Sequence, residues 1–552
     1  MSNKELSRAF RLIAALMELH NENPFKIKSY TFATQTLDRH EYQLSQLPLA
    51  DIYAIKGIGR SLGDVIDQLL QTQTAPILDE LIAKTPEGIL QMLSIKGIGP
   101  KKIKQLWDEL GIESAGELLY ACRENRLVAL KGFGAKTQEN IEKSIEYLLS
   151  NAGKYRYATL EAEALAIVKA LETQTGIERI SLTGAMRRKC EVVENIEIVV
   201  CCTPQTLLAH CQNLQMTIVA QTPTQIETQN TTGVSVVFYL ATPQNFVSRL
   251  FVTTASPQHL AQLNAPILEQ ADNEQQIYTQ LNLPYILPEW REGRNEIALA
   301  QQNKLPLDAI RTEDVRGVIH AHSTYSDGQH SLLQMAQACI AAGYQYLGIS
   351  DHSKAAFYAG GLTEEQIEQQ HREIDRLNEK LFPFRIFKGI EADILNTGDL
   401  DYDDAVLSTF DFVIASVHSN LKMTEEKAML RLLRAVENRH TTILGHPTGR
   451  LILSRLGYPV DHLRLIDACA ANNVCIELNA SPYRLDIDWR WIDYCMKKNV
   501  LISINPDAHS MEGVNDIRYG VYAARKGMLT KSFTLNTFSK DEIAAYFAQK
   551  KT

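Results

Sequence analysis

Long apolar runs are missing from this sequence. No stretch approaches the roughly 18 residues that a membrane-spanning helix needs, and the opening Met-Ser-Asn-Lys-Glu-Leu-Ser-Arg suits an amphipathic helix rather than a secretory signal. Paired cysteines are missing too, because the nine cysteines are scattered without a Cys-x-x-Cys motif, which favours reduced thiols. We therefore expect a cytoplasmic protein that makes no contact with a membrane.

Excess positive charge is absent as well. The formal net charge is −9, which argues against a generally basic nucleic-acid coat, so any binding to nucleic acid has to use local patches. A chain of 552 residues is long enough for three or four domains with a core in each. The features that are present are motifs, and they differ from one region of the chain to the next.

One short phrase occurs three times in the helical region 1–150, as Ile55-Lys-Gly-Ile-Gly59, Ile95-Lys-Gly-Ile-Gly99 and Leu130-Lys-Gly-Phe-Gly134. Glycines in a turn that opens a helix let the backbone approach an anion, and the helix N-terminus offers free N–H groups. The phrase resembles the helix-hairpin-helix motif, which grips DNA phosphates without reading bases. The alternative is that the glycines only end helices, but three copies with the same preceding lysine favour DNA contact. The predicted DNA-contacting residues are Gly57, Gly59, Gly97, Gly99, Lys101, Lys102, Gly132 and Gly134.

The middle of the chain has a mixed α+β pattern. There, residues 184–199 resemble the nucleotidyltransferase palm of family X DNA polymerases, in which a Gly-Ser pair and two arginines precede an Asp-x-Asp strand. Arg187 and Arg188 match the arginine pair, and residues 281–293 resemble the end of the family's thumb. The catalytic positions depart from the family pattern, with Ala185 for the serine and Asn195, Glu197 and Val237 for the three aspartates.

These substitutions remove the anions that two-metal phosphoryl transfer requires. Asn195 carries no charge, Val237 cannot coordinate a cation, and Glu197 is one methylene longer than aspartate. We therefore predict a palm that keeps its fold without transferring nucleotides; the alternative is that Glu197 and a nearby carboxylate rescue the reaction. The lysine that some family members use as a deoxyribose-phosphate lyase falls at Val65, so that activity is not expected either.

From Val315 onward, strand-like and helical stretches alternate, which predicts a mainly parallel sheet. Metal-type ligands stand at the ends of successive strand-like runs, as expected for a barrel whose active face is the C-terminal one. The spacing of His320 and His322, and of Asp507 and His509, places each pair on one face of its strand. The candidate metal ligands are His320, His322, Asp327, His352, Glu391, His418, His446, Asp507 and His509.

These residues match, one for one, the ligand set of the PHP phosphoesterase family, whose distorted (β/α)₇ barrel holds metal ions. The resemblance covers residues 316–552 and implies two to three divalent ions. Mixed imidazole and carboxylate ligands suit Mn²⁺ or Zn²⁺, with Fe²⁺ as an alternative, better than Mg²⁺ alone. The resemblance assigns the first ion to His320, His322, Glu391 and Asp507, the second to Glu391, His418 and His446, and the third to Asp327, His352 and His509.

Other polar residues of this region have secondary roles in the prediction. Asp351 precedes His352 and is expected to orient it. The candidates for holding a phosphate, each of which would also suit a surface ion pair, are Lys354, Arg450 and Arg484. The remaining histidines of the region are interpreted as core or surface residues, namely His330, His371, His440 and His462.

In architecture the whole chain resembles bacterial family X polymerases that carry a C-terminal PHP domain. We predict a multidomain protein with an N-terminal helical DNA-binding domain at 1–70 and an all-α helix-hairpin-helix, fingers-like domain at 71–150. A degenerate polymerase palm and thumb of α+β, nucleotidyltransferase-like fold follows at 151–305, and a distorted (β/α)₇ PHP barrel at 316–552. We expect a monomer whose partner is gapped, nicked or 3′-ended DNA.

The resemblance implies a metal-dependent DNA phosphodiesterase, a 3′-to-5′ exonuclease that processes DNA ends in repair. Three alternatives stay open: a gap-filling polymerase, a small-molecule phosphatase of histidinol-phosphatase type, and a DNA scaffold with structural metals. The eroded aspartates argue against the polymerase, and the three phosphate-gripping turns argue against the phosphatase.

Overall fold

The chain folds into two compact units, Met1–Ala152 and Gly153–Thr552. The computed structural model describes residues 1–40, 42–123, 127, 130–150, 153–453 and 456–550. The predicted domains 1–70 and 71–150 share one hydrophobic cluster in the first unit, and the palm, thumb and barrel make up the second. None of the described helices is long and apolar enough to cross a membrane.

The first unit is helical throughout the part that the structure describes. Its first helix begins with a capping box of Ser2 and Glu5, which satisfies free N–H groups at the helix start, and buries Leu6, Phe10 and Ile13 on one face. The helices are α1 (Asn3–Leu19), α2 (Pro24–Arg39), α3 (Leu49–Ala54), α4 (Arg60–Thr72), α5 (Pro76–Ala83), α6 (Glu87–Met92), α7 (Pro100–Leu110), α8 (Ala115–Arg123) and α9 (Ala135–Ser150).

The three glycine turns of this unit share one backbone conformation. The first glycine of each turn lies in the left-handed region, with φ of +93° at Gly57, +94° at Gly97 and +89° at Gly132, where side-chain-bearing residues are strained. The second glycine of each turn directly precedes α4, α7 or α9. The apolar residue between the two glycines is buried in all three turns, as Ile58, Ile98 and Phe133.

The palm is a five-stranded sheet in the order β2–β4–β7–β6–β5, in which β4 and β7 run parallel and the other neighbours antiparallel. The palm elements are β1 (Tyr155–Arg156), α10 (Tyr157–Glu172), β2 (Arg179–Leu182), α11 (Gly184–Arg187), β3 (Val192–Val193), β4 (Ile196–Cys201), α12 (Pro204–Asn213), β5 (Thr217–Thr222), β6 (Gln225–Gln229), β7 (Ser235–Ala241) and α13 (Phe246–Thr254). The thumb helices are α14 (Pro257–Leu263), α15 (Glu274–Gln280) and α16 (Glu296–Gln301).

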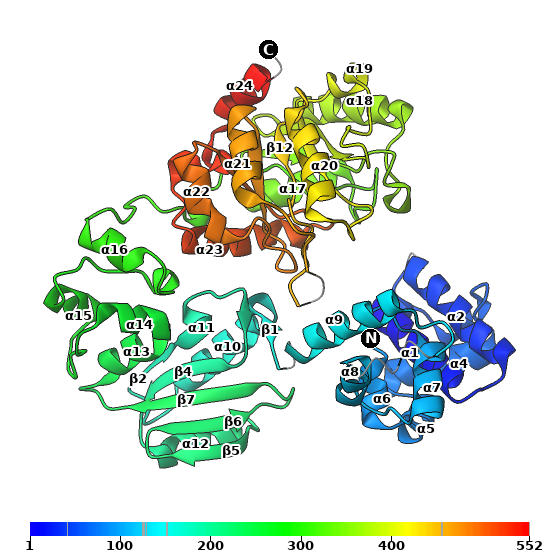
Figure 1. Ribbon diagram of the computed structural model, residues 1–552, viewed down its shortest axis with the longest axis horizontal. Coiled ribbons are helices and arrows are strands. Elements are labelled where there is room, and N and C mark those ends of the chain that lie inside the picture. Colours follow the sequence, from blue (N-terminus) through cyan, green and yellow to red (C-terminus); the bar gives the residue numbers. More distant parts are fainter. Residues whose placement is uncertain (41, 124–126, 128–129, 151–152, 454–455, 551–552) are drawn as a thin grey trace. The chain divides into compact units, whose positions relative to one another are not determined.

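The C-terminal region is a barrel of parallel strands in the order β8 to β14. The segments after β8 and β14 meet in a parallel bridge between Ala321 and Ala508, where the backbone N–H of His322 donates to the Ala508 carbonyl at 2.9 Å. Figure 1 shows the helices of this region, among them α18, α20 and α21, arranged around the strands. The predicted parallel barrel is therefore confirmed, and β13 is a strand that the sequence analysis did not identify.

The barrel elements alternate as predicted. The strands are β8 (Gly317–Val318), β9 (Tyr346–Ile349), β10 (Arg385–Asp393), β11 (Phe412–Ser416), β12 (Ile443–Leu444), β13 (Cys475–Asn479) and β14 (Ile502–Asn505). The helices are α17 (Leu332–Ala341), α18 (Glu364–Leu381), α19 (Asp404–Leu407), α20 (Glu425–Glu437), α21 (His462–Ala471), α22 (Ile492–Lys497), α23 (Ile517–Lys526) and α24 (Lys540–Lys550).

The thumb and palm contact the barrel through the end of α23. The buried ammonium of Lys526 donates to the Arg188 carbonyl at 3.0 Å and to the carboxylate of Glu292. The Trp290 indole donates to the Arg525 carbonyl at 2.6 Å. Because buried charges are stable only when they are paired, these contacts tie the palm, thumb and barrel into one unit.

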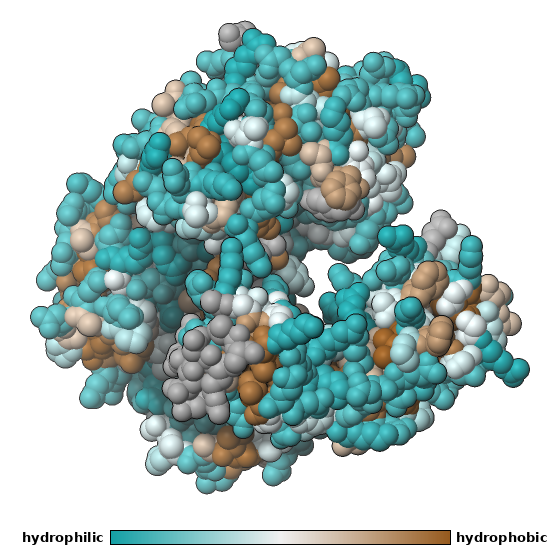
Figure 2. Space-filling view, turned by 45° about the vertical axis from the view of Figure 1, so that its right-hand side comes forward, coloured by the Kyte–Doolittle hydropathy of each residue, from teal (hydrophilic) through white to brown (hydrophobic). Residues whose placement is uncertain are grey.

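The outer surface is mainly polar on the face that Figure 2 shows, where hydrophobic residues lie in small separate patches. Scattered apolar side chains of this kind are ordinary on a protein surface. Buried histidines and carboxylates gather instead inside the barrel.

Candidate metal centre

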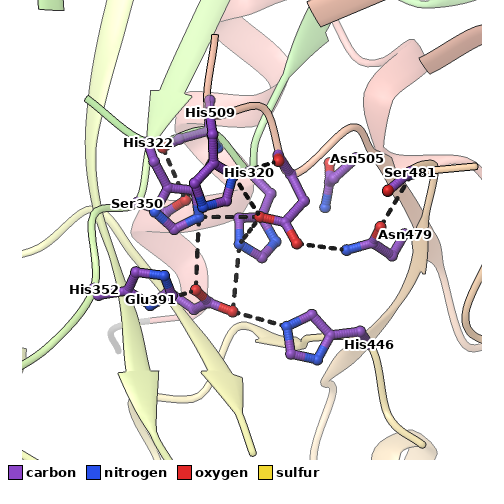
Figure 3. Close-up of polar contacts among 12 residues, drawn as sticks. His320, His322, Ser350, His352, Glu391, His446, Asn479, Ser481, Asn505 and His509 are labelled. Carbon is purple, nitrogen blue, oxygen red and sulfur yellow. Dashed lines mark hydrogen bonds and ion pairs between the residues drawn. The ribbon is translucent and has the colours of Figure 1, made fainter. Parts of the chain in front are cut away.

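The predicted ligands meet inside the barrel at the carboxyl ends of its strands. Glu391, near the end of β10, is the hub: its Oε1 lies 3.0 Å from His446 Nε2 and 3.1 Å from His418 Nε2. Its Oε2 lies 3.0 Å from His352 Nδ1. Figure 3 shows the imidazoles of His352 and His446 turned toward this carboxylate. The parallel strands therefore bring together side chains that are far apart in the sequence.

Two aspartates complete the cluster. Asp507 Oδ1 lies 3.1 Å from His322 Nε2 and 3.4 Å from His320 Nε2, and Asp327 Oδ1 lies 3.4 Å from His509 Nε2. Within the described part of the chain, donor atoms lie within 4.8 Å of one another in three groups, which are His322 with Asp327, His352 and His509; His320 with His322 and Glu391; and His352 with Glu391 and His418.

The donor set fits divalent cations. Five buried atoms of the centre have no hydrogen-bond partner among the described residues, namely His320 Nε2, His322 Nδ1, His352 Nδ1, His446 Nδ1 and Glu391 Oε2. Leaving buried polar atoms without a partner is costly. Imidazole nitrogens and carboxylate oxygens are ligands of Mn²⁺, Zn²⁺ and Fe²⁺, so cations bound here would satisfy those of these atoms that face the cluster.

The charges of the centre shift pKa values strongly. Burial lowers the pKa of His352, but the carboxylates of Glu391 and Asp327 outweigh it and raise this pKa to about 10. Burial raises the pKa of Glu391, yet the surrounding imidazoles hold it well below its usual range. For His322, burial and the neighbouring imidazoles together lower the pKa to about 3. Positive charges on protonated imidazoles thus offset the negative charges of the carboxylates. A cation that binds here displaces these protons.

Two buried carboxylates that the sequence analysis missed accept hydrogen bonds from predicted metal ligands. Glu477 in β13 accepts from His320 Nδ1 at 2.7 Å and from the backbone N–H of His446 at 2.8 Å. Asp393 accepts a hydrogen bond from His418 Nδ1. Such a carboxylate fixes the tautomer and turns the other ring nitrogen toward a metal. Two features of the sequence could have identified these carboxylates. Glu477 is an acid inside the apolar run of β13, and Asp393 lies two residues after Glu391 in β10, on the same face of that strand.

Asp351 has a different role from the one that the sequence predicted. Its carboxylate accepts from the backbone N–H and the hydroxyl of Ser323, both at 2.7 Å, and from the Ser326 hydroxyl at 2.6 Å. Burial raises its pKa, and among the described residues no imidazole donates to it. Asp351 therefore braces the turn that carries Asp327 instead of orienting His352.

Of the three phosphate candidates, Arg484 lies at the centre. Its Nε is 3.7 Å from Asp507 Oδ2, and its side chain is 21% exposed. Arg450 instead donates to the Asp488 carboxylate at 2.6 Å and to the Arg484 carbonyl at 2.9 Å, so it braces the loop that carries Arg484. Lys354 lies in an exposed ion pair at the surface.

The histidines that were interpreted as core or surface residues stand apart from the cluster. None of His330, His371, His440 and His462 belongs to the three donor groups of the described chain. His462, for example, stacks on Trp491 with ring centroids 4.6 Å apart.

The palm positions at which the resemblance predicted departures from catalytic aspartates form no comparable group among the described residues. Glu197 on β4 and Val237 on β7 are register partners, and Val237 is buried. The Glu197 carboxylate accepts from the Tyr239 hydroxyl at 2.9 Å and from the Ala185 backbone N–H at 3.1 Å. Glu197 is therefore already engaged by protein donors.

The arginine pair of the palm is also engaged. Arg187 donates to both oxygens of Glu274, at 2.9 and 2.7 Å, and Arg188 donates to Glu292 at 3.1 Å. Burial raises the pKa of Glu274, but hydrogen bonds and charges from Arg187 and Arg291 lower it to about 2. These arginines thus join the palm to the thumb.

Comparison with family models matches a helix-hairpin-helix domain at residues 1–75 and a SAM-like helix-hairpin-helix tandem at residues 89–145. A PHP domain matches residues 319–481. The predicted helix-hairpin-helix region and the predicted barrel family are therefore confirmed.

Curated relatives match either nearly the whole chain or a part of it. The DNA polymerase/3′-5′ exonuclease PolX of Bacillus subtilis is 34% identical over 574 residues, which cover 99% of this chain and 99% of the relative. A probable phosphatase of Clostridium acetobutylicum is 27% identical over 207 residues, 35% of this chain and 78% of the relative. A probable phosphatase of Acetivibrio thermocellus is 27% identical over 199 residues, 34% of this chain and 78% of the relative.

Proposed function

Because the chain belongs to the family of bacterial PolX proteins, family X DNA polymerases with helix-hairpin-helix domains and a C-terminal PHP domain, we propose that it is a metal-dependent phosphodiesterase that processes DNA 3′ ends in repair. The name of the Bacillus relative contains two activities, and we assign the exonuclease to this chain. The observation that carries the proposal is the contrast between two sites. The barrel gathers imidazoles and carboxylates into one cluster, whereas Glu197 in the palm lies beside a buried valine, Val237, on the neighbouring strand.

The proposed roles follow from the contacts. The metal ligands are the predicted set, His320, His322, Asp327, His352, Glu391, His418, His446, Asp507 and His509. A bound divalent cation, Mn²⁺ or Zn²⁺ by resemblance, supplies Lewis-acid polarisation of a phosphate ester. Glu477 and Asp393 orient the imidazoles that donate to them, and the guanidinium of Arg484 holds phosphate oxygens. The glycine turns of the first unit grip the DNA backbone.

The test is digestion of gapped DNA with a labelled strand in the presence of Mn²⁺. We expect wild type to shorten the strand from its 3′ end and His320→Ala to lose on the order of 100-fold or more of this activity, because a ligand is removed. His462→Ala is the matched control, since this barrel histidine stacks on Trp491 away from the cluster. Equal digestion by wild type and His320→Ala would refute the proposal.

The other activity in the relative's name, DNA polymerase, is a rival function for the palm. We expect no nucleotide incorporation on the same gapped template, because Asn195 and Val237 supply no anions for two cations. Incorporation that disappears with Glu197→Ala would assign a working polymerase site to the palm and contradict this part of the proposal.

The probable phosphatases among the relatives favour a third function, hydrolysis of small phosphomonoesters. Turnover of a phosphomonoester far above that of DNA would favour it. We expect the reverse ranking, because the chain also carries phosphate-gripping turns that a small substrate does not need.

A further inference from the structure

We propose that the palm takes part in hydrolysis at the barrel: Arg156 is a positioning residue that holds the barrel loop 481–488, and through it Arg484, against the phosphate. This inference rests on the proposed phosphodiesterase function, and it gives the palm a role in that function. It starts from one contact between the two parts of the second unit. The guanidinium carbon of Arg156 lies 3.9 Å from the centre of the Tyr483 ring.

The palm backbone fixes the position of Arg156. β1 pairs with β3, with Arg156 opposite Val192, and the next backbone N–H, of Tyr157, donates to the Glu191 carbonyl at 3.0 Å. The Tyr157 ring then packs edge-on against the Tyr519 ring of α23 in the barrel. Arg156 therefore reaches the barrel from an element that is anchored on both sides.

On the barrel side, the residue after Tyr483 is Arg484, the candidate phosphate ligand 3.7 Å from Asp507. The loop is strained at its next residue, because Leu485 has a φ of +45°, in the left-handed region that leucine rarely adopts. Such a conformation persists only where surrounding contacts hold it. Arg450 supplies one brace by donating to the carbonyls of Arg484 and Leu485, and Arg156 supplies another on the Tyr483 ring.

A second palm residue, Glu191, is linked to the end of the same loop through Arg490. Glu191 Oε1 lies 3.6 Å from a guanidinium nitrogen of Arg490, which in turn lies 2.9 Å from Asp488. Asp488 is the carboxylate that holds Arg450 at 2.6 Å. The palm thus contacts the loop directly at Tyr483 and indirectly, through Arg490, at Asp488, and Arg484 lies between these two positions.

The physical consequence is preorganisation of Arg484. A guanidinium binds a phosphate through a fixed fork of donors, so its contribution depends on how well its position is held before the substrate arrives. The planar guanidinium of Arg156 over the Tyr483 ring restricts the backbone that carries Arg484. Loss of this contact should weaken substrate binding while leaving the metal ligands in place.

The decisive substrate is bis(p-nitrophenyl) phosphate with Mn²⁺, because it is a phosphodiester without the flanking DNA that could bind Arg156 directly. We expect Arg156→Ala to raise KM by about two- to fivefold with little change in kcat, the range that an exposed cation–π contact supplies. The affinity of the Mn²⁺-loaded protein for inorganic phosphate, measured by calorimetry, should fall by the same factor. A direct contact between Arg156 and DNA could not produce either change.

A double-mutant cycle shows whether Arg156 acts through Arg484. In an Arg484→Ala background, Arg156→Ala should change KM and phosphate affinity no further, because the side chain that it positions is gone. Tyr483→Phe keeps the ring and should behave as wild type. Arg179→Ala is the matched control, since Arg179 stacks on Phe246 within the palm at 4.3 Å. Unchanged KM and phosphate affinity in Arg156→Ala, or additive effects in the cycle, would overturn the inference.

The two proposals can fail separately. If wild type binds phosphate but hydrolyses no diester, the proposed function fails, and the phosphate-binding cycle still decides the role of Arg156. If wild type hydrolyses the diester and the cycle is additive, the inference alone fails. If wild type neither hydrolyses the diester nor binds phosphate, both are overturned.

Discussion

At the scale of single residues, Glu477 shows how the barrel prepares its ligands. Its Oε1 accepts from both His320 Nδ1 and the Asn505 amide, at 2.7 and 3.1 Å, and its Oε2 accepts from the His446 backbone. The side chain is fully buried. A buried carboxylate with all its contacts satisfied is rigid, so two predicted ligands on different strands are oriented by one group.

We predict that Glu477→Gln weakens the binding of Mn²⁺ by about 10- to 100-fold, because the amide cannot support His320 as a carboxylate does. The substitution keeps the size of the side chain, so the barrel should still fold. Calorimetric titration with Mn²⁺ measures the effect directly. Glu379→Gln, on the exposed face of α18, is the control, and equal affinities for wild type and Glu477→Gln would contradict the prediction.

At the scale of elements, the two glycines of a helix-hairpin-helix turn are needed for different reasons. Gly97 has a φ of +94°, so the backbone conformation itself requires glycine. Gly99 precedes α7 with an ordinary φ of −97°, and a Cβ added there would meet nothing within 4 Å. The fold does not need a glycine at Gly99, so its predicted role, the close approach of an anion to the helix start, can be tested without a large loss of stability.

We predict that Gly97→Ala and Gly99→Ala differ in kind. Gly97→Ala should lower the free energy of unfolding by about 1–3 kcal/mol through backbone strain. Gly99→Ala should melt close to wild type yet bind DNA more weakly, because its methyl group stands where a phosphate approaches. Thermal melting and fluorescence anisotropy with labelled DNA at one fixed salt concentration separate the two effects.

The control for this comparison is Gly343→Ala, in the barrel, where φ is +85°. It should lose stability as Gly97→Ala does, without a change in DNA affinity. If Gly99→Ala bound DNA as tightly as wild type, the turn before α7 would have no contact with the backbone of DNA.

At the scale of the whole molecule, one apolar cluster runs through the palm and the barrel, and buried ion pairs reinforce it. Burial raises the pKa of Glu292, but the charges of Lys526 and Arg188 outweigh it and lower this pKa to about 2. Lys526 belongs to the barrel and Glu292 to the thumb. The stability of the second unit therefore depends on a charge that both parts share.

This pair gives the unit a pH dependence. The folded pKa of Glu292 lies below the value of about 4.3 for a free glutamate, so the pair contributes fully above about pH 5 and is lost as the pH falls toward 2. A shift of this size corresponds to roughly 3 kcal/mol. Denaturant unfolding of wild type and Glu292→Gln should show a large difference in stability at neutral pH that shrinks toward about pH 2; a difference that stayed constant with pH would contradict the prediction.

The sequence by itself determined the barrel, its nine candidate ligands and the three glycine turns. These features are local: a ligand such as His418 stands at the end of its own strand, and a turn such as that at Gly97 needs only its own glycine. The same local pattern identified the departures at Asn195 and Val237, whose side chains carry no negative charge in any fold.

Only the tertiary structure decided which groups contact and orient the candidate ligands and the phosphate candidates. Glu477 meets His320 across 157 positions of the chain, and Arg450, which could have faced a phosphate, is used up by Asp488 and two carbonyls. The contact of Arg156 with Tyr483 joins the palm to the barrel. A hydrogen-bond partner depends on how distant segments pack, and no local pattern of residues records that packing.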